Sequence, residues 1–150
     1  MVAKQRISIP NNILLGEVSS LLANGQEVII MTKGNSMLPF LRSERDSVAL
    51  RFMEPAVGKI ALAEIRPGQY VLHRITAIDG DRVTLMGDGN LRGVEHCLKG
   101  DVKGCVVRII DPRGKERTPG DGRLWRMLIP VRRYILFIYR KLHGIKNIQQ

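Results

Sequence analysis

Three side chains of this chain could together carry out nucleophilic catalysis. Ser36, His73 and Asp88 supply a hydroxyl, an imidazole and a carboxylate. A serine hydroxyl is a weak nucleophile until a base removes its proton, and a neutral imidazole can act as that base. A carboxylate that accepts a hydrogen bond from the imidazole fixes its tautomer and stabilises the imidazolium. The chemistry predicted for the set is attack of Ser36 on an acyl carbon.

Each of these residues alone has an ordinary structural explanation. Ser36, between Asn35 and Met37, is typical of a turn or a helix cap. His73 shares one face of a predicted strand with apolar residues, where a buried histidine often has a purely structural role. Asp88 lies in a Gly-Asp-Gly-Asn stretch that suits a turn. The catalytic interpretation therefore depends on the set and its surroundings.

The residues around Ser36 form the first of four short motifs that resemble one family. Gly34-x-Ser36-Met37-x-Pro39 is similar to the serine box, G-x-S-M-x-P, of the signal peptidase I and self-cleaving repressor superfamily. Residues 46–50 resemble the strand that follows this box in the family.

The later motifs indicate one branch of that superfamily. His73-Arg74 resembles the His-Arg pair of the endoplasmic-reticulum, archaeal and sporulation-associated signal peptidases, where other members use a lysine. Residues 87–90 are similar to the G-D-x-N box of that branch, and residues 102–106 to its closing V-x-G-x-V strand. The resemblance covers about residues 26–110.

The resemblance implies a serine endopeptidase that cleaves a peptide precursor. Ser36 would attack the peptide carbonyl, His73 would act as general base and then as general acid, and Asp88 would orient His73. The backbone N–H of Ser36 would contribute to the oxyanion hole. Members of the family bind an extended peptide by strand pairing and admit small residues beside the scissile bond.

The serine box departs from the family pattern at Gly34. Many signal peptidases have a serine there, whose hydroxyl helps to hold the oxyanion. A second donor is therefore expected from Asn35 or from another backbone amide. Gly34, Asn35, Met37 and Pro39 are predicted to border the oxyanion hole and the substrate groove.

A second departure lies after the G-D-x-N box, where the family has another acidic residue. Glu95 is the nearest substitute in this chain. The two departures keep open an alternative, a catalytically weak family member that binds peptides or assists their maturation. No metal or nucleotide cofactor is expected, because Cys97, Cys105 and His96 lack metal-ligand spacing and no complete glycine fingerprint occurs.

The size and charge of the chain limit the remaining possibilities. Its 150 residues are enough for one domain with a hydrophobic core. The formal net charge is +10, and seven of the basic residues follow Asp121, after which no acidic residue occurs. The first ten residues contain no apolar run long enough for a signal peptide or anchor, so a cytoplasmic location with reduced cysteines is expected.

Hydrophobic periodicity predicts a mainly β fold. We expect a helix over residues 12–24, followed by a coiled antiparallel sheet or small barrel. The predicted strands cover residues 27–32, 46–52, 59–65, 69–78, 82–86 and 102–110. The predicted organisation is an N-terminal helical segment (1–25), a peptidase-like β domain (26–110), an exposed linker (111–122) and a basic amphipathic C-terminal segment (123–150).

The C-terminal segment has two interpretations. An apolar stripe at helical spacing is predicted, with Pro130 as a kink, and it consists of Leu124, Leu128, Val131, Ile135, Ile138 and Leu142. Interspersed arginines argue against a spanning helix. The segment is expected either to lie on an anionic membrane surface, at its inner face, or to cover an exposed face of the sheet. Nucleic acid is not an expected partner, because no aromatic and basic platform accompanies the charge.

Overall fold

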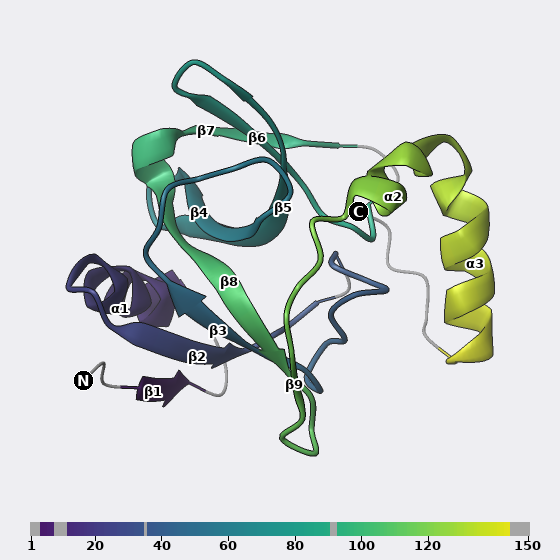
Figure 1. The fold of residues 1–150 in the computed structure, drawn as a ribbon, viewed down its shortest axis with the longest axis horizontal. Coiled ribbons are helices and arrows are strands. Elements are labelled where there is room, and N and C mark those ends of the chain that lie inside the picture. The colour runs from purple at the N-terminus through teal and green to yellow at the C-terminus, as the bar shows by residue number, and fades with distance from the viewer. Residues whose placement is uncertain (1–3, 8–11, 35, 91–92, 145–150) are drawn as a thin grey trace.

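The computed structural model describes residues 4–7, 12–34, 36–90 and 93–144, with the backbone alone for residues 4–7, 12–14 and 129. Nine strands form one curled, mostly antiparallel sheet, with the strand order β1-β2-β3-β8-β4-β5-β6-β7 and with β9 paired to β8 (Figure 1). The predicted mainly β class is confirmed. Of the two predicted forms, the coiled sheet is the one present, because the sheet stays open between its edge strands β1 and β7.

The elements follow one another along the chain as strands with a few short helices. The strands are β1 (Lys4–Ile7), β2 (Glu27–Met31), β3 (Ser47–Arg51), β4 (Ile60–Arg66), β5 (Gln69–Asp79), β6 (Arg82–Met86), β7 (Glu95–Leu98), β8 (Val102–Ile110) and β9 (Glu116–Arg117). The helices are α1 (Asn12–Ala23), α2 (Arg123–Met127) and α3 (Arg132–Leu142), with single 3-10 turns η1 (Lys99–Asp101) and η2 (Ile129–Val131).

All six predicted strands are present, with ends within one residue of the expected ones. Three further strands were not predicted, namely β1, β7 and β9. Each has four residues or fewer and contains charged side chains, so periodicity gives little signal for it. β1 pairs in parallel with β2, and β9 lies within the predicted linker, so the sheet extends beyond residues 26–110.

Two apolar clusters pack on the sheet, one on each face of β4. One cluster joins Val18 and Leu22 of α1 to side chains from β2, β3, β4 and β8. The other lies between β4, β5, β6 and β8 and includes both cysteines. Because side chains alternate along a strand, Leu62 of β4 enters the first cluster and its neighbour Ala63 enters the second. β5 has packed side chains on both faces and is therefore a rigid support for His73.

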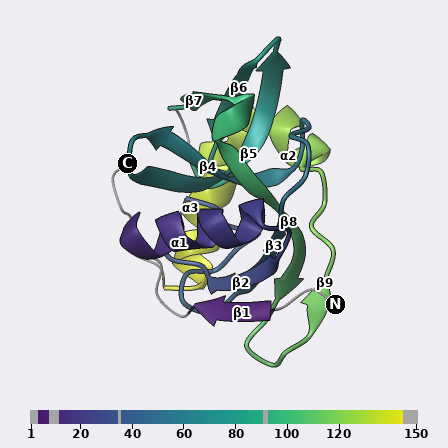
Figure 2. The ribbon, with the colours of Figure 1, turned by 90° about the vertical axis from the view of Figure 1, so that its left-hand side faces the viewer.

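The C-terminal segment packs on the sheet domain through a third cluster. Its members Trp125 and Leu136 contact Leu38, which comes from the loop between β2 and β3. α1 and α3 lie at opposite ends of the molecule, as the two views show (Figures 1 and 2). The residues described contain no helix with both the length and the apolar character needed to cross a bilayer.

The predicted apolar stripe of this segment is wrong in its phase. The chain does bend near Pro130, where α2 ends and the turn η2 precedes α3. The stripe is divided between two environments, because Leu128 and Ile135 pack against the third cluster whereas Leu124, Ile138 and Leu142 are exposed. The buried positions are instead Trp125, Arg132 and Leu136. A continuous 3.6-residue period does not hold across a 3-10 turn, which has three residues per turn.

The two cysteines are free and buried in the second cluster. Burial raises the pKa of each thiol from 9.0 to about 11, because an apolar environment disfavours the thiolate. We predict that Cys97 and Cys105 of the folded protein react with iodoacetamide about 100-fold more slowly at about pH 8 than those of the urea-unfolded chain. Mass spectrometry of timed samples measures both rates, and equal rates would contradict the burial of the thiols.

Candidate active site

Ser36 lies in the loop between β2 and β3, and the residues that follow it are anchored on two sides. Met37 is buried in the cluster under α1, whereas Leu38 is buried in the cluster under the C-terminal segment. Because neighbouring side chains are held by different parts of the core, the backbone at Ser36 has little freedom to shift. Gly34 on the other side donates its N–H to the Ser43 hydroxyl at 2.9 Å.

His73 of β5 connects Ser36 to a carboxylate. Its Nε2 lies 3.0 Å from Ser36 Oγ, and its Nδ1 lies 2.9 Å from Glu95 Oε2. The His73 ring is buried, whereas about a quarter of the Glu95 side chain is exposed. The three residues come from the β2–β3 loop, from β5 and from the start of β7.

The contact with Glu95 determines which ring nitrogen of His73 carries the proton. An ionised carboxylate can only accept hydrogen bonds, so the proton of the neutral ring lies on Nδ1 and is donated to Glu95. Nε2 then has a free lone pair directed at the Ser36 hydroxyl. This tautomer is the one a general base needs in order to take a proton from serine.

Asp88 does not have the role that the sequence predicted. Its carboxylate binds Arg74, whose Nε donates to Oδ1 at 2.8 Å and whose Nη2 donates to Oδ2 at 2.7 Å. The reason lies in the alternation of side chains along β5, which points His73 and Arg74 to opposite faces of the sheet. Asp88 lies on the Arg74 side, and Glu95 orients His73 in its place.

The guanidinium of Arg74 is fully buried and holds several loops together. Its Nη1 donates to the carbonyls of Gly58 at 2.8 Å and of Gly120 at 2.7 Å, and the group lies 5.4 Å from the centre of the Phe40 ring. Gly122 packs against the same guanidinium with a φ of 67°, and a β-carbon there would lie 2.5 Å from Arg74 Nε. The predicted linker is thus exposed along most of its length but fixed at its end.

The turn after β6 supports the backbone of Ser36. Gly89 donates its N–H to the Ser36 carbonyl at 2.7 Å, and Asp88 donates its N–H to Met37 Sδ at 3.4 Å. Gly87 faces the Ser36 carbonyl so closely that a β-carbon at this position would overlap with it. The motif that resembles the family's G-D-x-N box therefore positions the serine loop.

The C-terminal segment holds this turn from its outer side. Trp125 Nε1 donates to the Asp88 carbonyl at 2.8 Å. Arg132 is buried and donates to the carbonyls of Trp125 at 3.2 Å and of Asn90 at 3.4 Å, and its guanidinium lies over the Trp125 ring. Burial lowers the pKa of Arg132, and the nearby Asp88 carboxylate opposes that effect. The segment is thus part of the support of the site.

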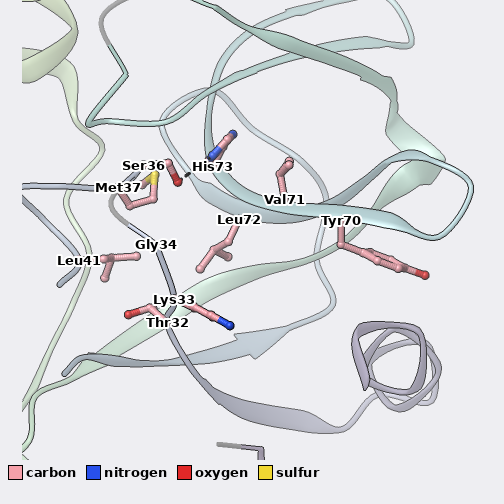
Figure 3. Close-up of a pocket in the computed structure, with 10 residues that line it drawn as sticks. All are labelled: Thr32, Lys33, Gly34, Ser36, Met37, Leu41, Tyr70, Val71, Leu72 and His73. Atoms are coloured by element: carbon pink, nitrogen blue, oxygen red, sulfur yellow. Dashed lines mark hydrogen bonds between the residues drawn. The ribbon is translucent and has the colours of Figure 1, made fainter. Parts of the chain in front are cut away.

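A pocket of about 190 Å³ opens beside Ser36 and His73 (Figure 3). One wall consists of residues 32–34 with Ser36, Met37 and Leu41, and the other wall is Tyr70 to His73 of β5. A pocket of this size is smaller than a typical cofactor site. Burial and a hydrogen bond with Glu64 raise the pKa of Tyr70, so its hydroxyl is neutral near pH 7.

The remaining predicted site residues differ in position. Gly34 and Met37 line the pocket. Pro39 is half-buried beyond Leu38, to which a cis peptide bond joins it, and it does not line the described part of the pocket. Asn35 lies outside the described residues, so its predicted role as an oxyanion donor stays a prediction.

Glu95 was identified in the sequence only as the nearest substitute for a missing acid. Its spacing from Asp88 gave no indication of a contact with His73. The pairing of β7 with β6 places Glu95 opposite Leu85, and this pairing brings the Glu95 carboxylate to His73. Within the described residues, no group of three or more His, Cys, Asp or Glu side chains is placed to hold a metal ion.

Comparison with known proteins gives no match from which a function could be inferred, so the function is argued from the geometry of the site. No protein-family model matches the chain, and no curated protein sequence matches it significantly.

The buried pair of Arg74 and Asp88 leads to a prediction about stability. Asp88→Asn removes the partner charge and leaves the Arg74 charge buried, which costs about 3 to 5 kcal/mol in comparable cases. We expect the free energy of unfolding to fall by that amount in urea titrations followed by the fluorescence of Trp125, the single tryptophan. Asp81→Asn, at an exposed turn, is the matched control and should change it by less than about 0.5 kcal/mol. Equal stabilities of the two variants would contradict this role of Asp88.

Proposed function

We propose that the protein is a serine endopeptidase, similar to signal peptidases, that cleaves a peptide or protein precursor. The observation that carries the proposal is the continuous contact from Ser36 Oγ to His73 Nε2 at 3.0 Å and from His73 Nδ1 to Glu95 Oε2 at 2.9 Å. Nucleophile, base and orienting carboxylate are each within hydrogen-bonding distance, which is the geometric requirement for an activated serine.

The proposed reaction proceeds in two halves. Ser36 Oγ attacks the peptide carbonyl carbon while His73 Nε2 takes the hydroxyl proton, and the imidazolium then gives that proton to the leaving amine. The amine departs and an ester on Ser36 remains. His73 next takes a proton from water as that water attacks the ester, and the imidazolium then returns the proton to the departing Ser36 Oγ, which releases the acid product and restores the serine hydroxyl. Glu95 stabilises the imidazolium in both halves.

The pocket suggests how a peptide would bind. From Gln69 to His73, β5 pairs with β4, and its pairing with β6 begins only at Arg74. The other edge of this stretch borders the pocket, where its backbone groups could pair with an extended peptide. Such pairing would hold the scissile carbonyl beside Ser36. The modest volume of the pocket suits small side chains next to that bond.

The proposed location of the enzyme is the cytoplasm. Its two cysteines are free thiols. Free thiols persist in a reducing compartment, where structural disulfides are rare. A substrate made in the cytoplasm, before or during export, would meet the enzyme there.

The test uses a peptide library with small residues before the scissile bond, incubated with the enzyme between about pH 6 and pH 9 and read by mass spectrometry. We expect wild type to cleave, and Ser36→Ala and His73→Ala each to lose cleavage by a factor of about 10³ or more, since each removes an essential part of the relay. Ser20→Ala, at an exposed position of α1, is the matched serine control outside the site. Peptide binding without cleavage by wild type would contradict the proposal and favour the peptide-binding alternative.

Glu95 has its own prediction, because it distinguishes this relay from one that uses Asp88. Glu95→Gln keeps the size of the side chain but lets the amide favour the wrong tautomer of His73, so kcat should fall about 10²- to 10⁴-fold. Glu54→Gln, at an exposed position, should leave kcat unchanged. Steady-state kinetics and thermal unfolding are measured together. A normal kcat for a folded Glu95→Gln protein would show that Glu95 has no part in the reaction.

A further inference from the structure

The outer side of the C-terminal segment exposes an unusual amount of apolar surface. Six large apolar side chains of α2 and α3 are each between 56% and 77% exposed. We refer to them as the outer apolar face, which comprises Leu124, Met127, Tyr134, Phe137, Ile138 and Leu142. Outside the C-terminal segment, large exposed apolar residues of the described chain occur at four scattered positions. A cluster of this kind marks an interaction surface rather than ordinary surface composition.

Basic side chains accompany this face. Arg133 and Lys141 are exposed on α3, and each lies four residues from Phe137, on the same side of the helix. Arg123 at the start of α2 is also exposed, and no acidic residue follows Asp121. The face therefore presents positive charge beside apolar and aromatic groups, with no negative charge from its own helices.

The fold does not need this face for its own packing. The opposite side of the segment provides the contacts with the domain, through Trp125, Arg132 and Leu136. In Figure 1, α3 lies at the edge of the molecule, with the sheet on one side of it only. Because its inner side is fixed, the outer side is presented in a defined orientation.

We propose that the outer apolar face docks the protein on an anionic lipid surface. Phe137, Tyr134 and the aliphatic side chains would enter the boundary between headgroups and acyl chains, while the basic side chains would contact lipid phosphates. Exposed leucine, isoleucine and methionine have no role in contacts with nucleic-acid phosphates, which argues for lipid over nucleic acid. The lack of acidic residues after Asp121 favours an anionic surface over a second copy of this positively charged face.

The candidate active site lies on the inner side of the segment that would dock on the membrane. The inner side of the same segment holds the turn from Gly87 to Asn90, which in turn supports Ser36. A protein docked by its outer apolar face would therefore hold its candidate active site close to the membrane. The inference concerns lipid binding alone and does not depend on the proposed peptidase activity.

The test is flotation of the full chain with vesicles of phosphatidylcholine alone and of phosphatidylcholine mixed with phosphatidylglycerol. We expect binding to the mixed vesicles at about 0.1 M salt, and a loss of at least ten-fold in the partition coefficient at about 1 M salt, where the Debye length falls from about 10 to about 3 Å. Binding to phosphatidylcholine alone should be weak. Ser36→Ala should bind as wild type does, which separates this test from any test of catalysis.

Paired variants identify the face. Phe137→Ser with Ile138→Ser should lower the partition coefficient at least ten-fold. Arg133→Gln with Lys141→Gln should lower it about 25-fold, because each basic residue near the surface contributes about five-fold, or about 1 kcal/mol. The matched controls are Phe52→Ser, which is as exposed as Phe137 at 58%, and Arg82→Gln on the distant β5–β6 hairpin. Circular dichroism verifies that every variant is folded.

The outcomes separate the possible occupants. Binding that needs both anionic lipid and the outer apolar face supports the proposal. Failure of wild type to float, or equal losses in the Phe52→Ser and Phe137→Ser proteins, would overturn it. Self-association that is abolished by Phe137→Ser, without any vesicle binding, would also overturn it and assign the face to a dimer.

Discussion

The buried ion pair between Arg74 and Asp88 is the interaction on which the rest of the site depends. A guanidinium inside a protein must have its charge and its donors matched, since an unpaired charge there is strongly destabilising. Arg74 meets this requirement with one carboxylate and two backbone carbonyls, contributed by three loops that are distant in the sequence. The need to satisfy one side chain thus fixes the turn after β6, the loop before β4 and the end of the segment before α2.

The position of His73 follows from the same strand. Because neighbours on a strand point to opposite faces, fixing Arg74 on one side directs His73 to the other, toward Ser36 and Glu95. The turn that carries Asp88 also donates a hydrogen bond to the Ser36 carbonyl, so the nucleophile and the base are aligned by a single network. Asp88 therefore fixes the positions of Arg74 and of the turn behind Ser36, whereas Glu95 stabilises the positive charge of the His73 imidazolium.

The sequence predicted the six longer strands and brought Ser36 and His73 into one hypothesis, because strand periodicity and ordered motifs are local signals. It did not predict which carboxylate meets His73. That outcome depends on the pairing of the four-residue strand β7 and on the burial of Arg74, and both are properties of the folded sheet. The phase of the C-terminal stripe failed for a related reason, since the turn η2 between α2 and α3 breaks the helical period. Local pattern thus identified the reacting groups, and tertiary contacts determined their partners.

The central claim is that His73 activates Ser36, and a fluorophosphonate probe tests it directly because the probe reacts with activated serines only. Wild type and His73→Ala would be incubated with the probe, digested, and examined by mass spectrometry for the peptide that contains Ser36. We expect an adduct on Ser36 in wild type and none in His73→Ala, with the other serines unmodified in both proteins. No adduct in wild type, or equal labelling of the two proteins, would contradict it.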